Sequence, residues 1–256
     1  MIGQFYIRKR SFFHSLDPRV KIIGTLLGII MLMLFNQPTL LLALFIGLLI
    51  VGKFLAGADF SYQFKLLKPV FPIVLITLAL WPVIYKPRLE GFFIGIAYSS
   101  RLLGFALVTF LLLMTTTQKE LVLGFVRLGL PYELGLTLTI ALRYIPTLYW
   151  LAGIIMDAQR SRGLELDKGN LFVRMRKMTA VLIPLIVASL KTAHELSIAL
   201  ESRAFGASKK RTFLRDLEMK PRDYVVLTLL LVGFVFALYA RYVLGFGHVS
   251  FYQGGA

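Results

Sequence analysis

Five long runs of apolar residues dominate the sequence, and short polar segments separate them. A helix that crosses the ~30 Å hydrocarbon core of a bilayer needs about 20 mostly apolar residues. The runs cover residues 18–35, 39–55, 69–85, 92–115 and 224–244. The pattern therefore predicts an all-α integral membrane protein with about five transmembrane helices.

The residues at the ends of the first two runs are those expected at helix boundaries. Asp17 can cap the free N–H groups of the helix that follows, and Pro18 stands where its missing N–H costs nothing. Asn36-Gln37-Pro38 then predicts a short turn before the second span. These signals fix where the first span begins and ends.

Two further apolar runs, residues 134–156 and 181–200, contain charged residues and prolines. These interruptions are Arg143, Pro146, Pro184, Lys191, His194 and Glu195. A charge at the middle of a span costs about 2.5–3.5 kcal/mol even on the scale derived from insertion experiments. We therefore favour amphipathic or protein-covered helices that lie at the cytoplasmic face, and a full span stays open for both.

The segment between the fourth and fifth spans is too long to be a simple connector. It opens with a capping box, in which Thr117 and Glu120 satisfy the first free amides reciprocally. Three helices are expected: one that ends near 129–131, one over 133–159 and one over 171–201. The predicted domains are a membrane region of four spans (1–116), a helical cytoplasmic region (117–222), and the last span with the C-terminal tail (223–256).

Two places in the cytoplasmic region share one pattern. Each is a small–Arg–small triplet at the C-terminal end of a long predicted helix: Ser161-Arg162-Gly163 and Ser202-Arg203-Ala204, with the arginines 41 residues apart. Small neighbours allow another backbone to approach, and a guanidinium can form paired hydrogen bonds with a carboxylate. Two ordinary helix C-termini would also have an arginine near the dipole and a residue suited to a left-handed cap. The residues alone slightly favour this second interpretation.

Composition excludes several classes of protein. Hydrophobic residues make up 57% of the chain and charged residues 16%, whereas soluble domains have about 25% charged residues. The formal net charge is +16, but the unbroken apolar runs argue against a nucleic-acid-binding protein and against disorder. The absence of cysteine excludes a disulfide framework and Cys-ligated zinc or iron–sulfur sites. We therefore expect a lipid bilayer around the chain and no nucleic-acid partner.

Basic residues are concentrated in two segments. Residues 1–21 contain five, among them Arg8, Lys9 and Arg10, and residues 157–223 contain fourteen, against eight acidic residues. Cytoplasmic loops of membrane proteins carry the excess of Lys and Arg. Five spans with a cytoplasmic N-terminus place both segments on the same side, so this is the orientation that we predict.

The sequence has no motif for catalysis or for metal binding. It lacks a phosphate-binding P-loop and a Gly-x-Ser-x-Gly nucleophile elbow, and His14, His194 and His248 lack metal-ligand spacing. The rival hypothesis is a stand-alone intramembrane carrier or enzyme that acts around Arg101 and Arg143. For Arg101 we favour the simpler alternative, in which the side chain snorkels or binds a backbone carbonyl.

Seven landmarks follow one another along the chain. They are the segment from His14 to Lys21, Thr115-Thr116-Thr117, the segment from Ala141 to Pro146, that from Met156 to Gly163, Ile183-Pro184-Leu185, that from Glu201 to Gly206, and Arg211-Thr212. In their order and spacing, the chain resembles the transmembrane T components (EcfT/CbiQ-like) of energy-coupling factor (ECF) ABC-type transporters. The resemblance covers nearly the whole chain.

In such transporters two cytosolic ATPase subunits of the EcfA type hydrolyse ATP, and a membrane S component binds the substrate. The resemblance implies that this chain is the non-catalytic subunit that links them in ATP-driven uptake of a micronutrient, either a vitamin or a metal ion. It also implies that ATP and Mg are held by the ATPases, that this chain needs no cofactor, and that the membrane is the cell membrane of a prokaryote.

The resemblance further implies that the cytoplasmic region contains two coupling helices whose Ala-Arg-Gly-like triplets contact the two ATPases. Ser161-Arg162-Gly163 and Ser202-Arg203-Ala204 correspond to these triplets. This chain has serine at both first positions, a nearly isosteric change, and Ala204 in place of the second glycine. The additional methyl group of Ala204 predicts a looser contact or a cap that is less left-handed.

Overall fold

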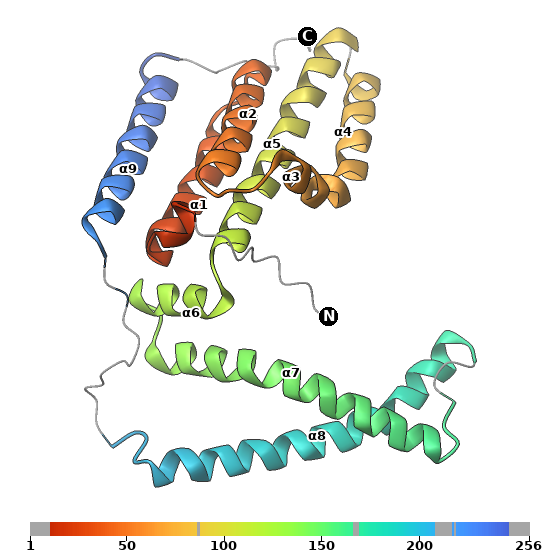
Figure 1. Ribbon diagram of the computed structural model, residues 1–256. Helices are drawn as coiled ribbons and strands as arrows, with labels where there is room; N and C mark the ends of the chain where they lie inside the picture. Colours follow the sequence, from red (N-terminus) through yellow and green to blue (C-terminus); the bar gives the residue numbers. More distant parts are fainter. Residues whose placement is uncertain (1–10, 86–87, 166–168, 208–216, 218, 246–256) are drawn as a thin grey trace. The chain divides into compact units, whose positions relative to one another are not determined.

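The computed structural model describes residues 11–85, 88–165, 169–207, 217 and 219–245. Within these residues it contains nine α-helices, two short 3-10 helices and no strand, which confirms the expected all-α class. The described residues form two compact units, the first within 1–130 and 217–256 and the second within 131–216 (Figure 1). Two groups of residues used above lie outside the described residues. They are Arg8, Lys9 and Arg10, which support the predicted orientation, and Arg211-Thr212, which is part of the resemblance.

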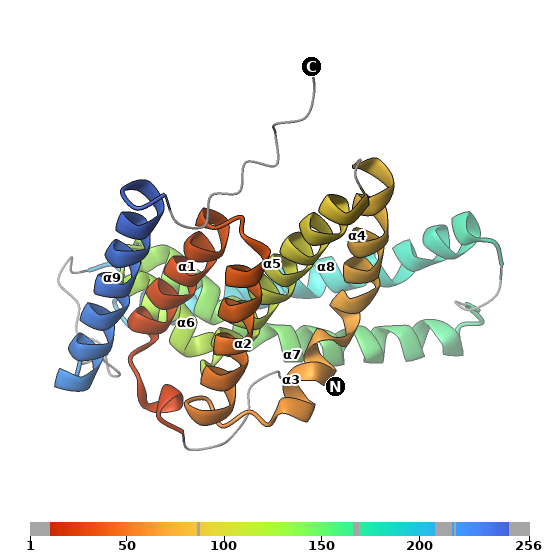
Figure 2. The ribbon, with the colours of Figure 1, turned by 90° about the horizontal axis from the view of Figure 1, so that it is seen from above.

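The first unit is a bundle built around α5. Its helices are α1 (Pro18–Leu34), α2 (Pro38–Phe54), α3 (Phe60–Leu67), α4 (Phe71–Ile84), α5 (Arg88–Thr115), α6 (Gln118–Arg127) and α9 (Pro221–Tyr242). Helices α1, α2 and α4 pack against α5, whereas α6 and α9 pack against α1 (Figure 2). The helix that starts the chain and the helix that ends it are therefore neighbours.

Helical segments that are long and apolar enough to cross a bilayer include the third, fourth and fifth predicted spans. Within the described residues these segments are Phe60–Ile84, Arg88–Thr115, Tyr132–Ser161 and Pro221–Tyr242. The first two predicted spans form α1 and α2, which have 17 residues each and are about 26 Å long at 1.5 Å per residue. Spans of this length fit a bilayer when flanking cations snorkel, and Lys53 in the last turn of α2 is placed to do so.

Helix α7 (Tyr132–Ser161) of the second unit contains an apolar run that we expected at the cytoplasmic face. Its length and composition place it among the candidate spans, although Arg143 lies in its interior. Helix α8 (Leu171–Ser202), which contains the second ambiguous run, is not among the candidate spans found in the described residues. The position of α7 relative to the bilayer therefore stays a prediction.

A close approach of α4 and α5 holds one side of the bundle together. At Gly91 of α5, a Cβ atom would lie only 2.7 Å from the carbonyl oxygen of Trp81 and 2.8 Å from the Cα atom of Pro82. Small residues let helix backbones approach closely, and such packing is a main source of association between helices in membranes. Farther along α5, the ring of Tyr98 stacks on that of Trp81 with centroids 4.7 Å apart.

The predicted helix caps are present. The Asp17 carboxylate accepts a hydrogen bond from the Arg19 N–H at 2.9 Å, and Pro18 is the first residue of α1. At the start of α6, the Glu120 carboxylate accepts from the Thr117 N–H at 2.9 Å, and the Thr117 hydroxyl accepts from the Glu120 N–H at 3.4 Å. These two helices therefore begin where their residues predict.

The segment from His14 to Lys21, the first of the seven landmarks, connects the start of α1 to the start of α9. The Asp223 carboxylate, which is buried, accepts from the main-chain N–H of Asp17 at 3.1 Å and from that of Lys220 at 2.8 Å. Two arginines bond in opposite directions across the same junction: Arg19 donates to the Leu217 carbonyl at 2.6 Å, and Arg222 donates to the Ser15 carbonyl at 2.5 Å. These hydrogen bonds join the residues before α9 to the residues before and at the start of α1.

Arg101 closes the C-terminal end of α1. Its guanidinium donates to the carbonyls of Leu32 at 3.1 Å and Phe35 at 2.7 Å, and to the side-chain oxygen of Asn36 at 2.8 Å. The last carbonyls of a helix have no donor within the helix, so a cation that reaches them removes a penalty that apolar surroundings make large. The simpler alternative for Arg101, binding to backbone carbonyls, is confirmed.

Replacing Arg101 by leucine should destabilise the first unit, because the carbonyls at the end of α1 then lose their donors. Hydrogen bonds to a charged group contribute about 1.5–3 kcal/mol each, so we expect a loss of at least about 2 kcal/mol. Thermal unfolding of the detergent-solubilised protein, followed by circular dichroism, measures the change. Arg88→Leu, at an exposed position of the same helix, is the matched control, and equal melting temperatures for the two variants would contradict this role of Arg101.

Candidate coupling site

The second unit places the two arginine triplets at the C-terminal ends of its two helices. Helices α7 and α8 pack against each other as an αα-hairpin (Figure 1). Asn170 caps the start of α8, where its side-chain oxygen accepts from the Leu171 N–H at 2.8 Å. The predicted helices over 133–159 and 171–201 are thus present, each within two residues of its expected ends.

The first triplet forms a left-handed cap at the end of α7. Arg162 is the C-cap residue, and Gly163 has φ +86°. The Leu164 N–H donates to the Gln159 carbonyl at 3.0 Å, and the Gly163 N–H donates to the Arg160 carbonyl at 2.9 Å. This pair of bonds is the Schellman motif, which satisfies carbonyls that the helix itself leaves free.

The second triplet repeats this geometry at the end of α8. The Phe205 N–H donates to the Leu200 carbonyl at 3.0 Å, and the Ala204 N–H donates to the Glu201 carbonyl at 2.9 Å. The C-cap arginines have similar backbone angles: φ −84° and ψ 9° at Arg162, φ −94° and ψ 17° at Arg203. We call residues 159–164 and 200–205 the arginine turns.

The prediction that Ala204 makes the second cap less left-handed is wrong. Ala204 has φ +55°, and among the described residues it is the sole non-glycine residue with a positive φ. A side chain in this region strains the backbone, since the Cβ atom approaches the following carbonyl. The two hydrogen bonds of the Schellman motif hold Ala204 in this conformation, so the turn has the shape that a glycine would give it.

The serines that open the triplets direct their hydroxyls back into their own helices. The Ser161 hydroxyl donates to the Asp157 carbonyl at 3.1 Å, and the Ser202 hydroxyl donates to the Ala199 carbonyl at 3.0 Å. Because these hydroxyls are already paired, they add little polarity to the outer surface of the turn. This geometry accommodates serine at the position where the resemblance implies alanine.

Both arginines are available to a partner. Arg162 and Arg203 are exposed, and their side chains form no hydrogen bond or ion pair with any described residue. A Cβ atom added at Gly163 would meet nothing within 4 Å, so the space beside Arg162 is open. Each turn therefore presents a free guanidinium between two small neighbours.

Sequence reasoning identified the triplets but missed the residues that complete their turns. Leu164 and Phe205 supply the longer hydrogen bond of each Schellman motif, and Gln159 and Leu200 accept it. The signal was present in the sequence, because a left-handed residue after a helix fixes which residues before and after it will pair. The turns are therefore units of six residues.

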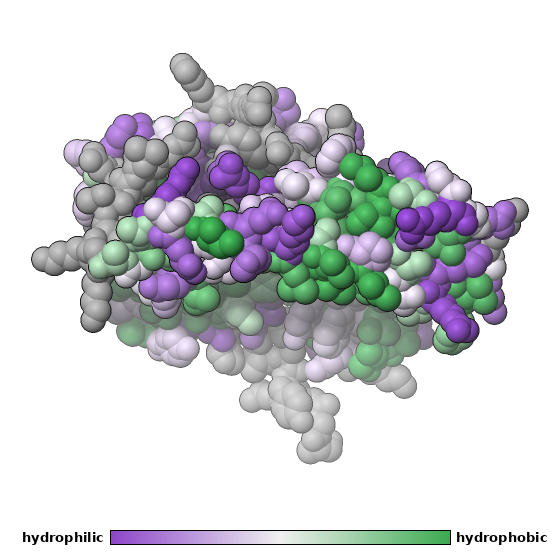
Figure 3. Space-filling view, turned by 90° about the horizontal axis from the view of Figure 1, so that it is seen from below, coloured by the Kyte–Doolittle hydropathy of each residue, from purple (hydrophilic) through white to green (hydrophobic). Residues whose placement is uncertain are grey.

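Large apolar side chains are exposed on both helices of the second unit. On α7 they include Leu138, Tyr149 and Trp150; on α8 they include Phe172, Val187 and Leu190. Figure 3 shows apolar patches (green) beside hydrophilic ones (purple) on the face that it presents. Exposed apolar surface on this scale marks contact with another protein or with a membrane.

The rival site around Arg101 and Arg143 gains no support from the geometry. Arg101 belongs to the first unit and already donates to three acceptors, whereas Arg143 is an exposed residue of α7 in the second unit.

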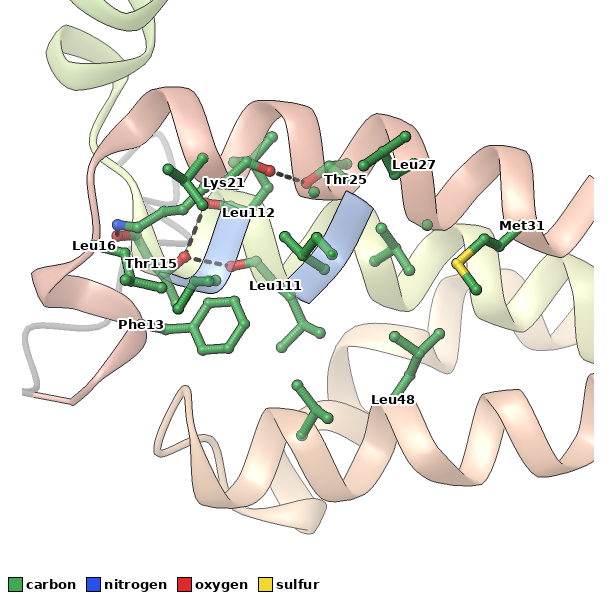
Figure 4. Close-up of a pocket in the computed structure, with 17 residues that line it drawn as sticks. Phe13, Leu16, Lys21, Thr25, Leu27, Met31, Leu48, Leu111, Leu112 and Thr115 are labelled. Carbon is green, nitrogen blue, oxygen red and sulfur yellow. Dashed lines mark hydrogen bonds between the residues drawn. The ribbon is translucent and has the colours of Figure 1, made fainter. Parts of the chain in front are cut away.

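A cavity of about 280 Å³ does lie in the first unit between α1, α2, α5 and α9 (Figure 4). Of the described residues that line it, Lys21 alone is ionisable, and its ammonium donates to the Thr115 carbonyl at 2.9 Å.

The candidate membrane spans define an all-α membrane protein, and its second helical unit contains the two arginine turns. A family model described as "CbiQ: Cobalt transport protein" matches residues 9–213. Relatives named energy-coupling factor transporter transmembrane protein EcfT match over most of their length. The relative from Acidaminococcus fermentans is 33% identical, with 94% of this chain and 96% of the relative covered.

Two further relatives of the same name extend this comparison. The EcfT of Clostridium kluyveri is 35% identical over 88% of this chain and 90% of its own length. The EcfT of Bacillus subtilis is 35% identical over 91% of this chain and 94% of its own length. The chain belongs to the CbiQ family, and it is an energy-coupling transmembrane component of the ECF type.

The two turns predict opposite effects of substitutions at their left-handed residues. Gly163→Ala should destabilise its turn by about 1 kcal/mol, because alanine is strained at positive φ, and Ala204→Gly should relieve a similar strain. Hydrogen exchange of the Leu164 and Phe205 amides measures the two closures separately. Faster exchange at Leu164 and slower exchange at Phe205 are expected, and a change of the same sign at both would contradict the shared geometry.

Proposed function

We propose that this chain is the non-catalytic energy-coupling subunit of an ECF-type, ATP-driven uptake transporter for a micronutrient. It links two cytosolic ATPase subunits to a membrane S component that binds the substrate. The single observation that carries this proposal is the pair of arginine turns, which have the same backbone geometry and the same exposed guanidinium at the ends of two long packed helices.

The chemistry of the turns suits a protein partner that offers carboxylates. A guanidinium forms paired, charge-assisted hydrogen bonds with a carboxylate, and these are about twice as strong as bonds between neutral groups. The turn backbone is fixed by its own hydrogen bonds, so little conformational entropy is lost when it docks. Two turns of one shape suit two ATPase subunits, with Ser161, Arg162 and Gly163 on one and Ser202, Arg203 and Ala204 on the other.

The exposed apolar faces of α7 and α8 suit the S component and the lipid around it. Such surface costs free energy in water at about 25 cal/mol per Å², so it needs a cover. A helix pair that contacts ATPases at its ends and a membrane protein along its sides transmits a displacement from one to the other. ATP and Mg bind to the ATPases, and this chain itself performs no chemistry.

The orientation follows from the same roles. The N-terminus and the arginine turns lie on the cytoplasmic side, where ATP is available, and the membrane is the cell membrane of a prokaryote. The S component selects the substrate, a vitamin or a metal ion. Cobalt, which appears in the description of the matching family, is one such ion.

Charge reversal at the turns tests the proposal. Arg162→Glu and Arg203→Glu should each weaken binding of the ATPase that contacts that turn, because a carboxylate then faces carboxylates. We expect loss of that ATPase on affinity purification of the complex from the native host. Substrate uptake through the native S components should fall by at least about tenfold, as expected for loss of one charge-assisted pair.

Arg174→Glu is the matched control, because Arg174 is an exposed arginine in the first turn of α8 and lies outside both arginine turns. It should leave assembly and uptake unchanged. Normal assembly and uptake with both Arg162→Glu and Arg203→Glu would show that the turns are not the coupling site.

A further inference from the structure

Pro184 lies inside α8 and leaves one backbone carbonyl of that helix without its helical donor. Proline has no N–H, so the carbonyl four residues earlier loses its partner within the helix. That carbonyl belongs to Ala180. In a helix packed among apolar side chains, an unpaired carbonyl costs free energy until another donor reaches it.

The donor comes from α7. The side-chain amide nitrogen of Gln159 lies 3.2 Å from the Ala180 carbonyl oxygen, and the bond is partly buried. Gln159 is also the residue whose own carbonyl accepts from Leu164 in the first arginine turn. One residue therefore closes the turn that carries Arg162 and bonds to α8 at the proline.

We propose that Gln159 is a positioning residue, whose bond to the carbonyl released by Pro184 fixes how α7 crosses α8 and hence where Arg203 lies relative to Arg162. Gln159 precedes Arg162 by three residues, so the first turn lies at the contact. Arg203 follows Ala180 by 23 residues, which is a lever about 35 Å long. A rotation of about 10° at the contact would move Arg203 by roughly 6 Å along such a lever.

The second interior proline provides a control. Pro146 of α7 likewise deprives the Leu142 carbonyl of its helical donor. No side chain of a described residue donates to that carbonyl, so Pro146 has no counterpart of Gln159. The predicted effect is specific to the pair Gln159 and Pro184.

The transport consequence of this inference rests on the proposed function, but the geometry can be measured independently of it. Because the chain has no cysteine, spin labels can be attached at Glu133→Cys and Glu195→Cys, exposed positions on α7 and α8. Electron–electron resonance distances are then recorded on the full chain assembled with its ATPases and S component in nanodiscs. Gln159→Leu keeps the side-chain volume without the donor, and Gln159→Glu keeps the length without the donor.

Both Gln159 variants should broaden the label distance distribution by several ångströms, while the ATPases still co-purify because both arginines are intact. Pro184→Ala supplies an N–H to the Ala180 carbonyl, so in that background the Gln159 variants should cause no further broadening. In the Pro146→Ala background the Gln159 variants should broaden the label distance distribution as much as they do in the chain with Pro146. A distribution that Gln159→Leu leaves unchanged, or effects of Gln159→Leu and Pro184→Ala that simply add, would overturn the inference.

ATP hydrolysis by the same complexes gives a second readout. We expect the Gln159 variants to lower substrate-coupled hydrolysis by roughly fivefold, the fold-change expected for one hydrogen bond. If instead the labels report a broadened crossing while Arg162→Glu and Arg203→Glu still assemble normally, the proposed function fails and the role of Gln159 in the crossing stands.

Discussion

A helix in apolar surroundings cannot leave its terminal backbone groups without partners, and the rest of this structure depends on that constraint. Water normally satisfies these groups, but a bilayer or a packed neighbour excludes it. The polar side chains of the first unit meet this need: Arg101 at the end of α1, Lys21 at the end of α5, and Asp223 at the starts of α1 and α9. Charges that look costly in an apolar sequence are thus part of its hydrogen bonding.

The same constraint has a different solution in the second unit. There the chain closes the ends of α7 and α8 with its own backbone, through the two Schellman motifs. Because main-chain N–H groups satisfy the carbonyls, Arg162 and Arg203 are not consumed as caps, unlike Arg101. The local geometry therefore separates arginines that hold the fold together from arginines that are free to bind a partner.

Several features follow from local sequence alone because their causes lie within a few residues. Asp17 with Pro18, and Thr117 with Glu120, predicted helix starts that the structure confirms. The triplets predicted the ends of α7 and α8 to within two residues. Ala204 was misjudged, because the intrinsic preference of alanine is weaker than the two hydrogen bonds that hold it left-handed. The runs predicted α1 and α2 to within one residue at each end.

The sequence by itself determined the all-α membrane class, the caps and the position of the arginine turns, since apolar runs and caps act over one to three helical turns. Only the tertiary structure decided what the long-range polar groups bind. Arg101 reaches carbonyls 66 and 69 residues away, Asp17 meets a carboxylate 206 residues away, and Gln159 pairs with a carbonyl that a proline on another helix set free. No local pattern encodes such pairs, because each depends on which helix ends packing brings together.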